Sequence, residues 1–166
     1  MKTAFLISCT LLFSLAFQAQ DFKVPKKIKL DKAEDYAEYE DEVLRAIEWL
    51  KNTPLTEQKA KRKKVNAFLL RWMTGTPDIS ITVDLRISPY AENGECIIMF
   101  MAGWAEYVLT KKDDSKTECA YAGTIAVLDF YKKNRAELGK IRSLKKLEKK
   151  RKKGELKAHI EKLTNP

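Results

Sequence analysis

The stretch Cys96-Ile-Ile-Met-Phe-Met-Ala-Gly-Trp-Ala-Glu-Tyr-Val-Leu109 decides the fold, because it is apolar on almost every side. A helix that is hydrophobic all round belongs at the centre of a small domain. Glu106 and the length of the run do not suit a membrane span, which needs about 20 consecutive apolar residues. The sequence therefore predicts a buried helix over 96–109.

A second apolar helix is predicted over 117–134, and a polar turn joins it to the first. If the two form an antiparallel hairpin, Gly103 faces Gly123, and these small residues let the helix backbones approach closely. The same register separates Cys96 from Cys119 by roughly 16 Å along the helix axis. Because a disulfide cannot bridge that distance, we expect two free, buried thiols.

Apolar side chains spaced by three and four predict two helices before this hairpin. The first covers 31–51, with Asp31 and Glu34 as a capping pair. The second starts at Pro54 and ends at Gly75. Its first half is rich in Lys and Arg and is expected to lie in solvent.

Residues 78–88 change to a period of two, because Ile79, Ile81, Val83, Leu85 and Ile87 alternate with polar residues. This pattern favours a strand, and a helix started by Thr76-Pro77 is the alternative. The other alternating stretch, 22–30, is interrupted by Lys26. We expect a mainly α, single-domain bundle of five or six helices, and a short two-stranded β ribbon remains open.

Residues 1–19 have the order of a secretory signal peptide: Lys2 near the start, an apolar run, and a small residue, Ala19, at the end. We expect cleavage after Ala19 and export to the periplasm or beyond. No stretch of the mature chain is long enough to form a transmembrane span.

The formal net charge of +9 is unevenly distributed. Residues 21–131 contain 17 Lys or Arg and 19 Asp or Glu. Residues 132–162, in contrast, contain 14 Lys or Arg and only 4 Asp or Glu. The mature chain is therefore divided into a helical body, 20–139, and a basic C-terminal helical segment, 140–166. Apolar stripes in predicted helices around 140–152 and 155–163 are expected to dock this segment on the body.

The basic segment suggests a surface for anionic partners. Export disfavours nucleic acid as a partner and leaves lipid headgroups, acidic polysaccharide or an acidic protein. The alternative is that the Lys-rich face only keeps the protein soluble. The candidate binding residues are Lys145, Lys146, Lys149, Lys150, Arg151, Lys152 and Lys153.

The sequence shows no pattern typical of a catalytic, metal or nucleotide site. His159 is the single histidine, and the six glycines form no phosphate-binding loop. Carboxylates cluster between Asp35 and Glu42, but such a run on a helix usually forms a solvated surface. We therefore expect a non-catalytic binding or structural protein of the cell envelope, without a metal or cofactor.

Trp49, Trp72 and Trp104 each fall within an apolar helical stripe, which indicates core packing. The alternative is a ligand cleft among these helices, where the aromatic faces hold an apolar molecule or a sugar. The sequence leaves both interpretations open.

Two segments, Asn66-Ala-Phe-Leu-Leu-Arg-Trp-Met-Thr-Gly-Thr-Pro77 and Met99-Phe-Met-Ala-Gly-Trp104, resemble an uncharacterised family of small exported, mainly helical proteins of the Bacteroidota. The Ala19-Gln20 end of the signal is similar to signals in that group. The resemblance implies a compartment and a helical fold, and it implies no catalytic or binding residue.

Overall fold

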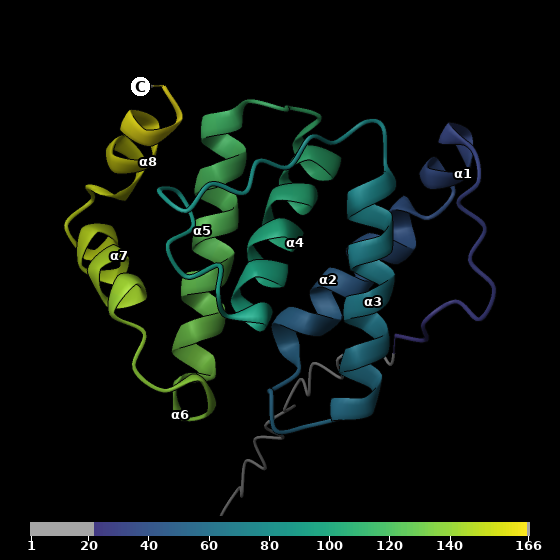
Figure 1. The fold of residues 1–166 in the computed structure, drawn as a ribbon, viewed down its shortest axis with the longest axis horizontal. Coiled ribbons are helices and arrows are strands. Elements are labelled where there is room, and N and C mark those ends of the chain that lie inside the picture. Colours follow the sequence, from purple (N-terminus) through teal and green to yellow (C-terminus); the bar gives the residue numbers. More distant parts are fainter. Residues whose placement is uncertain (1–21, 166) are drawn as a thin grey trace, which may run out of the picture.

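The computed structural model describes residues 22–165, which form eight helices and no strand (Figure 1). The predicted signal peptide, 1–19, lies outside these residues. The mainly α class is confirmed. In chain order the elements are α1 (Ala33–Ala37), α2 (Glu40–Asn52), α3 (Lys59–Gly75), α4 (Gly94–Lys111), α5 (Lys116–Lys133), α6 (Arg135–Leu138), α7 (Arg142–Lys152) and α8 (Leu156–Thr164). The helices exceed the expected five or six because the predicted 31–51 helix is divided into two, α1 and α2, and because the four-residue α6 was not predicted.

The antiparallel hairpin of α4 and α5 forms the centre of the fold, as the apolar runs predict. A Cβ atom built on Gly103 would lie 2.6 Å from the Cβ of Ala126 and 3.0 Å from the Cα of Gly123. The predicted close approach of the two glycines is thus confirmed. Cys96 and Cys119 are both free and completely buried, as expected.

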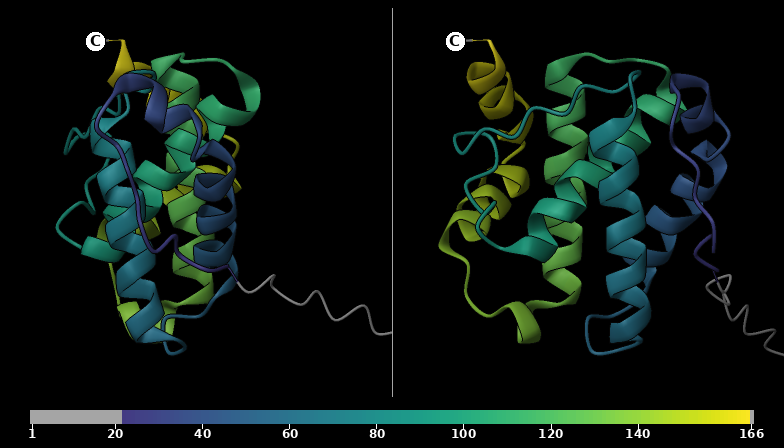
Figure 2. Two further views of the ribbon diagram at one scale, coloured as in Figure 1. Left: turned by 90° about the vertical axis from the view of Figure 1, so that its right-hand side faces the viewer. Right: turned by 45° about the vertical axis from the view of Figure 1, so that its right-hand side comes forward.

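Two helical pairs flank this hairpin (Figures 1 and 2). α2 and α3 pack against α4, while α7 and α8 pack against α5. Leu144, Leu147, Leu156 and Ile160 are at most 4% exposed, so α7 and α8 belong to the same hydrophobic core as the hairpin. The basic segment is therefore packed on the body.

The predicted strand over 78–88 and the β ribbon are wrong for the part of the chain that the structure describes. The 76–93 loop runs across α4 and α5 without regular structure (Figure 1). Phe22, in the other alternating stretch, stacks on Phe68 of α3 instead, with ring centroids 6.3 Å apart. Because the two stretches lie on different parts of the fold, neither has a strand to pair with.

The predicted 31–51 helix is interrupted between α1 and α2. The carbonyl oxygen of Tyr36 accepts the indole N–H of Trp72 at 2.9 Å, and it also accepts the N–H of Tyr39 at 3.1 Å. The helix starts differently too, because Asp35 rather than Glu34 accepts backbone N–H groups, those of Asp31 and Lys32, at 2.8 and 3.0 Å. These bonds lower the pKa of Asp35.

α3 begins at Lys59 rather than at Pro54. Its basic first half was expected to lie in solvent, but one of its cations is buried. Arg62 is only 3% exposed. Its guanidinium lies over the rings of Trp49 and Phe130, with centroid distances of 5.7 and 5.9 Å, and donates to the carbonyl oxygen of Thr53. The long side chain thus closes the bottom of the core while its charge remains hydrogen-bonded.

Candidate functional site

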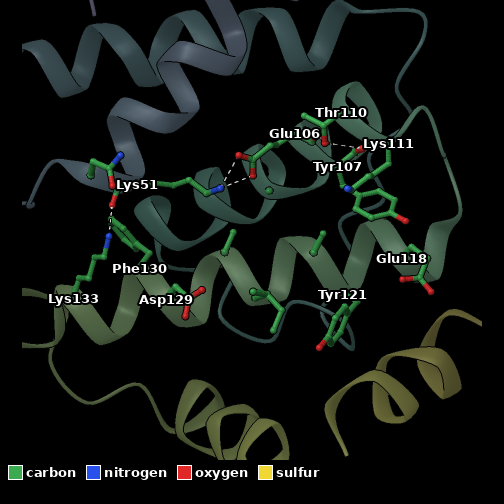
Figure 3. Close-up of a pocket in the computed structure, with 15 residues that line it drawn as sticks. Lys51, Glu106, Tyr107, Thr110, Lys111, Glu118, Tyr121, Asp129, Phe130 and Lys133 are labelled. Carbon is green, nitrogen blue, oxygen red and sulfur yellow. Dashed lines mark hydrogen bonds and ion pairs between the residues drawn. The ribbon is translucent and has the colours of Figure 1, made fainter. Parts of the chain in front are cut away.

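An open groove of about 610 Å³ follows the seam between α4 and α5 (Figure 3). Its lining includes Gly103, Ala122 and Ala126 together with Ile125. The small side chains that let the helices approach also leave the seam unfilled on this side. None of the residues of the 76–93 loop lines the groove.

Most charged side chains along the groove are paired. Lys51 of α2 reaches across to Glu106 of α4, and its Nζ lies 2.7 and 2.5 Å from the two carboxylate oxygens (Figure 3). The Nζ of Lys133 donates to the carbonyl oxygen of Lys51 at 3.1 Å. Three cations and three carboxylates line the groove in all: Lys51, Lys111, Lys133, Glu106, Glu118 and Asp129. The lining therefore has no net charge.

The groove is long and narrow because one face of α5 supplies most of its lining. The residues from Glu118 to Lys133 recur at intervals of three and four, which places them on one side of the helix. This interval spans about 22 Å at a rise of about 1.5 Å per residue. At one end the Tyr107 hydroxyl donates to Asp113 at 3.0 Å, and this bond is the largest factor raising the pKa of Tyr107 to about 12.

A second hollow, of about 570 Å³, lies between α5 and α7 and is strongly basic. Arg135 donates to both carboxylate oxygens of Glu148, at 2.9 and 2.7 Å, and Arg151 donates to Asp129 at 2.6 Å. We call this hollow the cleft; it is lined by Leu128, Asp129, Lys132, Arg135, Glu148, Arg151 and Lys152. Its four cations exceed its two carboxylates by two charges.

The predicted anion-binding residues divide between two sides of α7. Arg151 points toward α5, where it forms a surface ion pair with Asp129. The other six form what we call the outer face: Lys145, Lys146, Lys149, Lys150, Lys152 and Lys153. Among the residues that the structure places, Lys153 lies 3.9 Å from Glu155, and the other five lysines of this face have no ion pair.

The three tryptophans are 1–3% exposed, and none of them lines the groove or the cleft. Trp72 donates to the backbone of α1, and Trp49 lies under Lys61 and Arg62. In this conformation the indole faces pack in the core. The ligand cleft that the sequence suggested at Trp49, Trp72 and Trp104 stays a prediction that would require these helices to move apart.

Neither thiol is suited to act as a nucleophile. Burial raises the pKa values of Cys96 and Cys119 to about 11, so both are protonated at neutral pH. Burial also lowers the pKa of His159, helped by nearby Lys150 and Lys162. Over residues 22–165, no three His, Cys, Asp or Glu side chains are grouped to hold a metal ion. None of the helices in that range combines the length and hydrophobicity of a membrane span.

Sequence reasoning missed both hollows. Gly103 and Gly123 predict the register of the two helices, but they do not show which small residues face outward. Ala122 and Ala126, four residues apart on one side of α5, were the available signal for a groove. For the cleft, the signal was two cations three residues apart at the end of the second apolar helix and just after it, Lys132 and Arg135.

Comparison of the chain with models of protein families, with curated proteins and with solved structures finds no match. The resemblance to exported helical proteins of the Bacteroidota therefore stays a prediction.

Proposed function

We propose that this protein is exported and attaches, as a non-catalytic binding protein of the cell envelope, to an anionic surface through the outer face of α7. The observation that carries the proposal is a set of five lysines without ion pairs on one side of a docked helix. Leu144 and Leu147 hold the opposite side of α7 in the core. The cations are therefore presented on a fixed helix face.

If the outer face of α7 binds an anionic surface, the binding should weaken as the salt concentration rises. Each Lys close to an anionic membrane contributes about 1 kcal/mol to binding, and this attraction is screened by salt within about 10 Å at 0.1 M. Residues 21–131 are nearly neutral and add little to such a field. The exported location is part of the proposal, and N-terminal sequencing of the secreted protein tests whether the chain starts at Gln20.

The direct test is co-sedimentation with vesicles of phosphatidylglycerol and of phosphatidylcholine, at low and high salt. We expect binding to the anionic vesicles only, and release by salt. Replacing Lys145, Lys146, Lys149 and Lys150 by Gln should weaken binding at least about a hundredfold.

A matched control removes four exposed cations from α3: Lys59, Lys63, Lys64 and Arg71 become Gln. This variant loses the same total charge but keeps the outer face of α7. Equal loss of binding in the two variants would show that net charge alone acts, and binding that persists at high salt would refute the proposal.

A second candidate function is the binding of a small apolar molecule. The groove between α4 and α5 favours it because its lining has no net charge and includes small and apolar residues, and the tryptophans do not take part. Its volume of about 610 Å³ lies within the range of ordinary ligand pockets. Apolar ligands should then shift the NMR signals of Tyr121 and Ile125 and leave those of the three indoles unchanged.

A further inference from the structure

We propose that the groove and the cleft together form one site for a single-chain lipid phosphate, with its acyl chain in the groove and its phosphate in the cleft. This inference rests on the proposed function, since it names a lipid ligand for a protein that we place at an anionic surface. It deepens that proposal because the site uses residues of α4, α5, α6 and α7 beside the outer face of α7 and shares only Lys152 with that face.

The two hollows share one lining residue. Asp129 lines both the groove and the cleft, and its partner Arg151 lines the cleft. The two side chains are 52% and 41% exposed, so this ion pair lies at the surface and can rearrange around a ligand at low cost. In the proposed complex, an elongated molecule lies over α5 at this shared residue and reaches into both hollows.

The groove matches an acyl chain in polarity and shape. The charges of its lining residues sum to zero, and the lining also includes the small and apolar residues Gly103, Ala122, Ala126 and Ile125. A charged ligand would gain no net attraction there, whereas apolar surface gains from leaving water. The length of about 22 Å along α5 suits an extended chain better than a compact ring system.

The cleft matches a phosphate. Arg135 is held by both oxygens of Glu148 and stacks over the ring of Tyr131 at 4.9 Å, so its guanidinium is already ordered. Lys132 and Lys152 are exposed beside it, and neither has an ion pair within residues 22–165. The excess of two positive charges complements a phosphate monoester, which carries about −1.5 to −2 at pH 7. Ordered arginines with free donors recognise phosphate oxygens well.

Isothermal titration of the exported chain with 1-acyl-glycerol 3-phosphate, kept below its micelle concentration, tests the proposal. The monoacylglycerol with the same chain and glycerol 3-phosphate are the comparison probes. We expect both to bind at least about tenfold more weakly, because each lacks one half of the ligand. Equal binding of the uncharged lipid would overturn the phosphate role, and equal binding of glycerol 3-phosphate would mean a free-phosphate site.

Two variants divide the site. Ala122→Leu fills the groove, and Lys132→Gln removes a cation from the cleft; each should weaken binding of the acyl phosphate about tenfold or more. Ala67→Leu and Lys64→Gln make the same changes on exposed positions of α3 and should bind as the unaltered chain does. If neither Ala122→Leu nor Lys132→Gln weakens binding, the proposal is refuted.

A photoreactive acyl chain provides a readout that does not depend on a variant folding. We expect cross-links in the peptides that contain Tyr107 and Tyr121, which border the groove. Cross-links to α2 or α3 away from the groove would overturn the assignment.

Failure of this proposal is distinguishable from failure of the proposed function. Loss of vesicle binding on changing the outer-face lysines, together with no acyl-phosphate binding, refutes only the lipid site. Binding of the acyl phosphate with no salt-sensitive vesicle binding refutes only the surface attachment and leaves the lipid site supported.

Discussion

Single residues in the central hairpin control packing through their volume. Gly103 and Gly123 are not at turns; they lie inside α4 and α5, where glycine lowers helix stability by about 0.5–1 kcal/mol relative to alanine. The close contact of the two backbones offsets that loss. A position of this kind is recognisable in a sequence when two apolar helices each carry one central glycine.

The first prediction concerns Gly103→Ala. The new methyl group would meet Ala126 at 2.6 Å and the backbone of Gly123 at 3.0 Å, and backbone atoms cannot rotate away. Overpacking of about 1–3 kcal/mol should outweigh the gain in helix propensity of up to about 1 kcal/mol. Urea unfolding should therefore show a less stable protein. Gly94→Ala, in the same helix, meets nothing within 4 Å, and it should be neutral or slightly stabilising.

The second prediction concerns the thiols. Because burial raises the pKa values of Cys96 and Cys119 to about 11, the folded chain should react with iodoacetamide at pH 8 at least about a hundredfold more slowly than the unfolded chain. Peptide mapping by mass spectrometry measures each cysteine separately. Rapid labelling of either one in the folded protein, or a peptide in which the two are joined by a disulfide, would contradict the structure.

At the scale of elements, the apolar helices could be predicted from the sequence, and the segments between them could not. Periodicity locates α4, α5, α7 and α8 because each buries a stripe of its own side chains. The break between α1 and α2 instead depends on Trp72, which lies 36 residues after Tyr36. The indole N–H of Trp72 donates a hydrogen bond to the carbonyl oxygen of Tyr36. Local patterns do not contain such a distant hydrogen bond.

The 76–93 loop shows why an alternating pattern can mislead. Ile79 and Ile87 are buried against the core, as strand residues would be, but Val83 and Leu85 between them are 48% and 67% exposed. The loop packs on the core near its two ends, and its middle projects into solvent. Alternation alone cannot distinguish this arrangement from a strand, because a strand also requires a neighbour.

The third prediction follows from the buried cation in α3. Arg62 donates to Thr53 and lies 3.5 Å from a carboxylate oxygen of Glu95. Replacing it by Gln leaves a buried carbonyl without its donor and should cost about 2 kcal/mol in the free energy of unfolding. Lys63→Gln, at the next position but in solvent, should change it by less than about 0.5 kcal/mol. If urea unfolding gives the same free energy of unfolding for the two variants, Arg62 does not contribute to stability.

The fourth prediction concerns the turn within the loop. The carboxylate of Asp84 accepts the backbone N–H of Arg86 at 2.8 Å and pairs with its guanidinium at 2.6–3.1 Å, which lowers the pKa of Asp84 from 3.8 to about 2. Because the folded pKa is lowered, the carboxylate stabilises the fold above about pH 4, and this contribution disappears as the pH falls toward 2. NMR titration of the Asp84 carboxyl should measure the lowered value. Arg86→Gln should raise it part of the way back, since the backbone bond remains.

At the scale of the whole molecule, the hollows arise from the way two helical pairs flank one hairpin. α2 supplies Lys51 to one end of the groove, and α7 supplies Arg151 and Glu148 to the cleft, about 100 residues later. The sequence predicted that the basic segment is docked and that its lysines are exposed. It did not predict which neutral surface lies beside them, because that depends on how three helices meet.

The fifth prediction separates the charge of the C-terminal segment from its packing. Leu144, Leu147, Leu156 and Ile160 are 0–4% exposed, and each buried side chain contributes about 1.5–3 kcal/mol. Their combined contribution is comparable with the whole stability of a domain, about 5–15 kcal/mol. Deleting 140–166 should therefore leave a chain that has lost its cooperative unfolding transition, as measured by circular dichroism in urea.

Changing the outer-face lysines to Gln should preserve that transition, because these side chains make no buried contact on which the core depends. Loss of surface binding in the deletion alone would therefore report unfolding rather than lost charge. If the shortened chain instead unfolds cooperatively with undiminished stability, α7 and α8 are an appendage of an independent body. The cleft would then be a contact between two separable parts, and its ion pairs Arg135–Glu148 and Arg151–Asp129 would be what joins them.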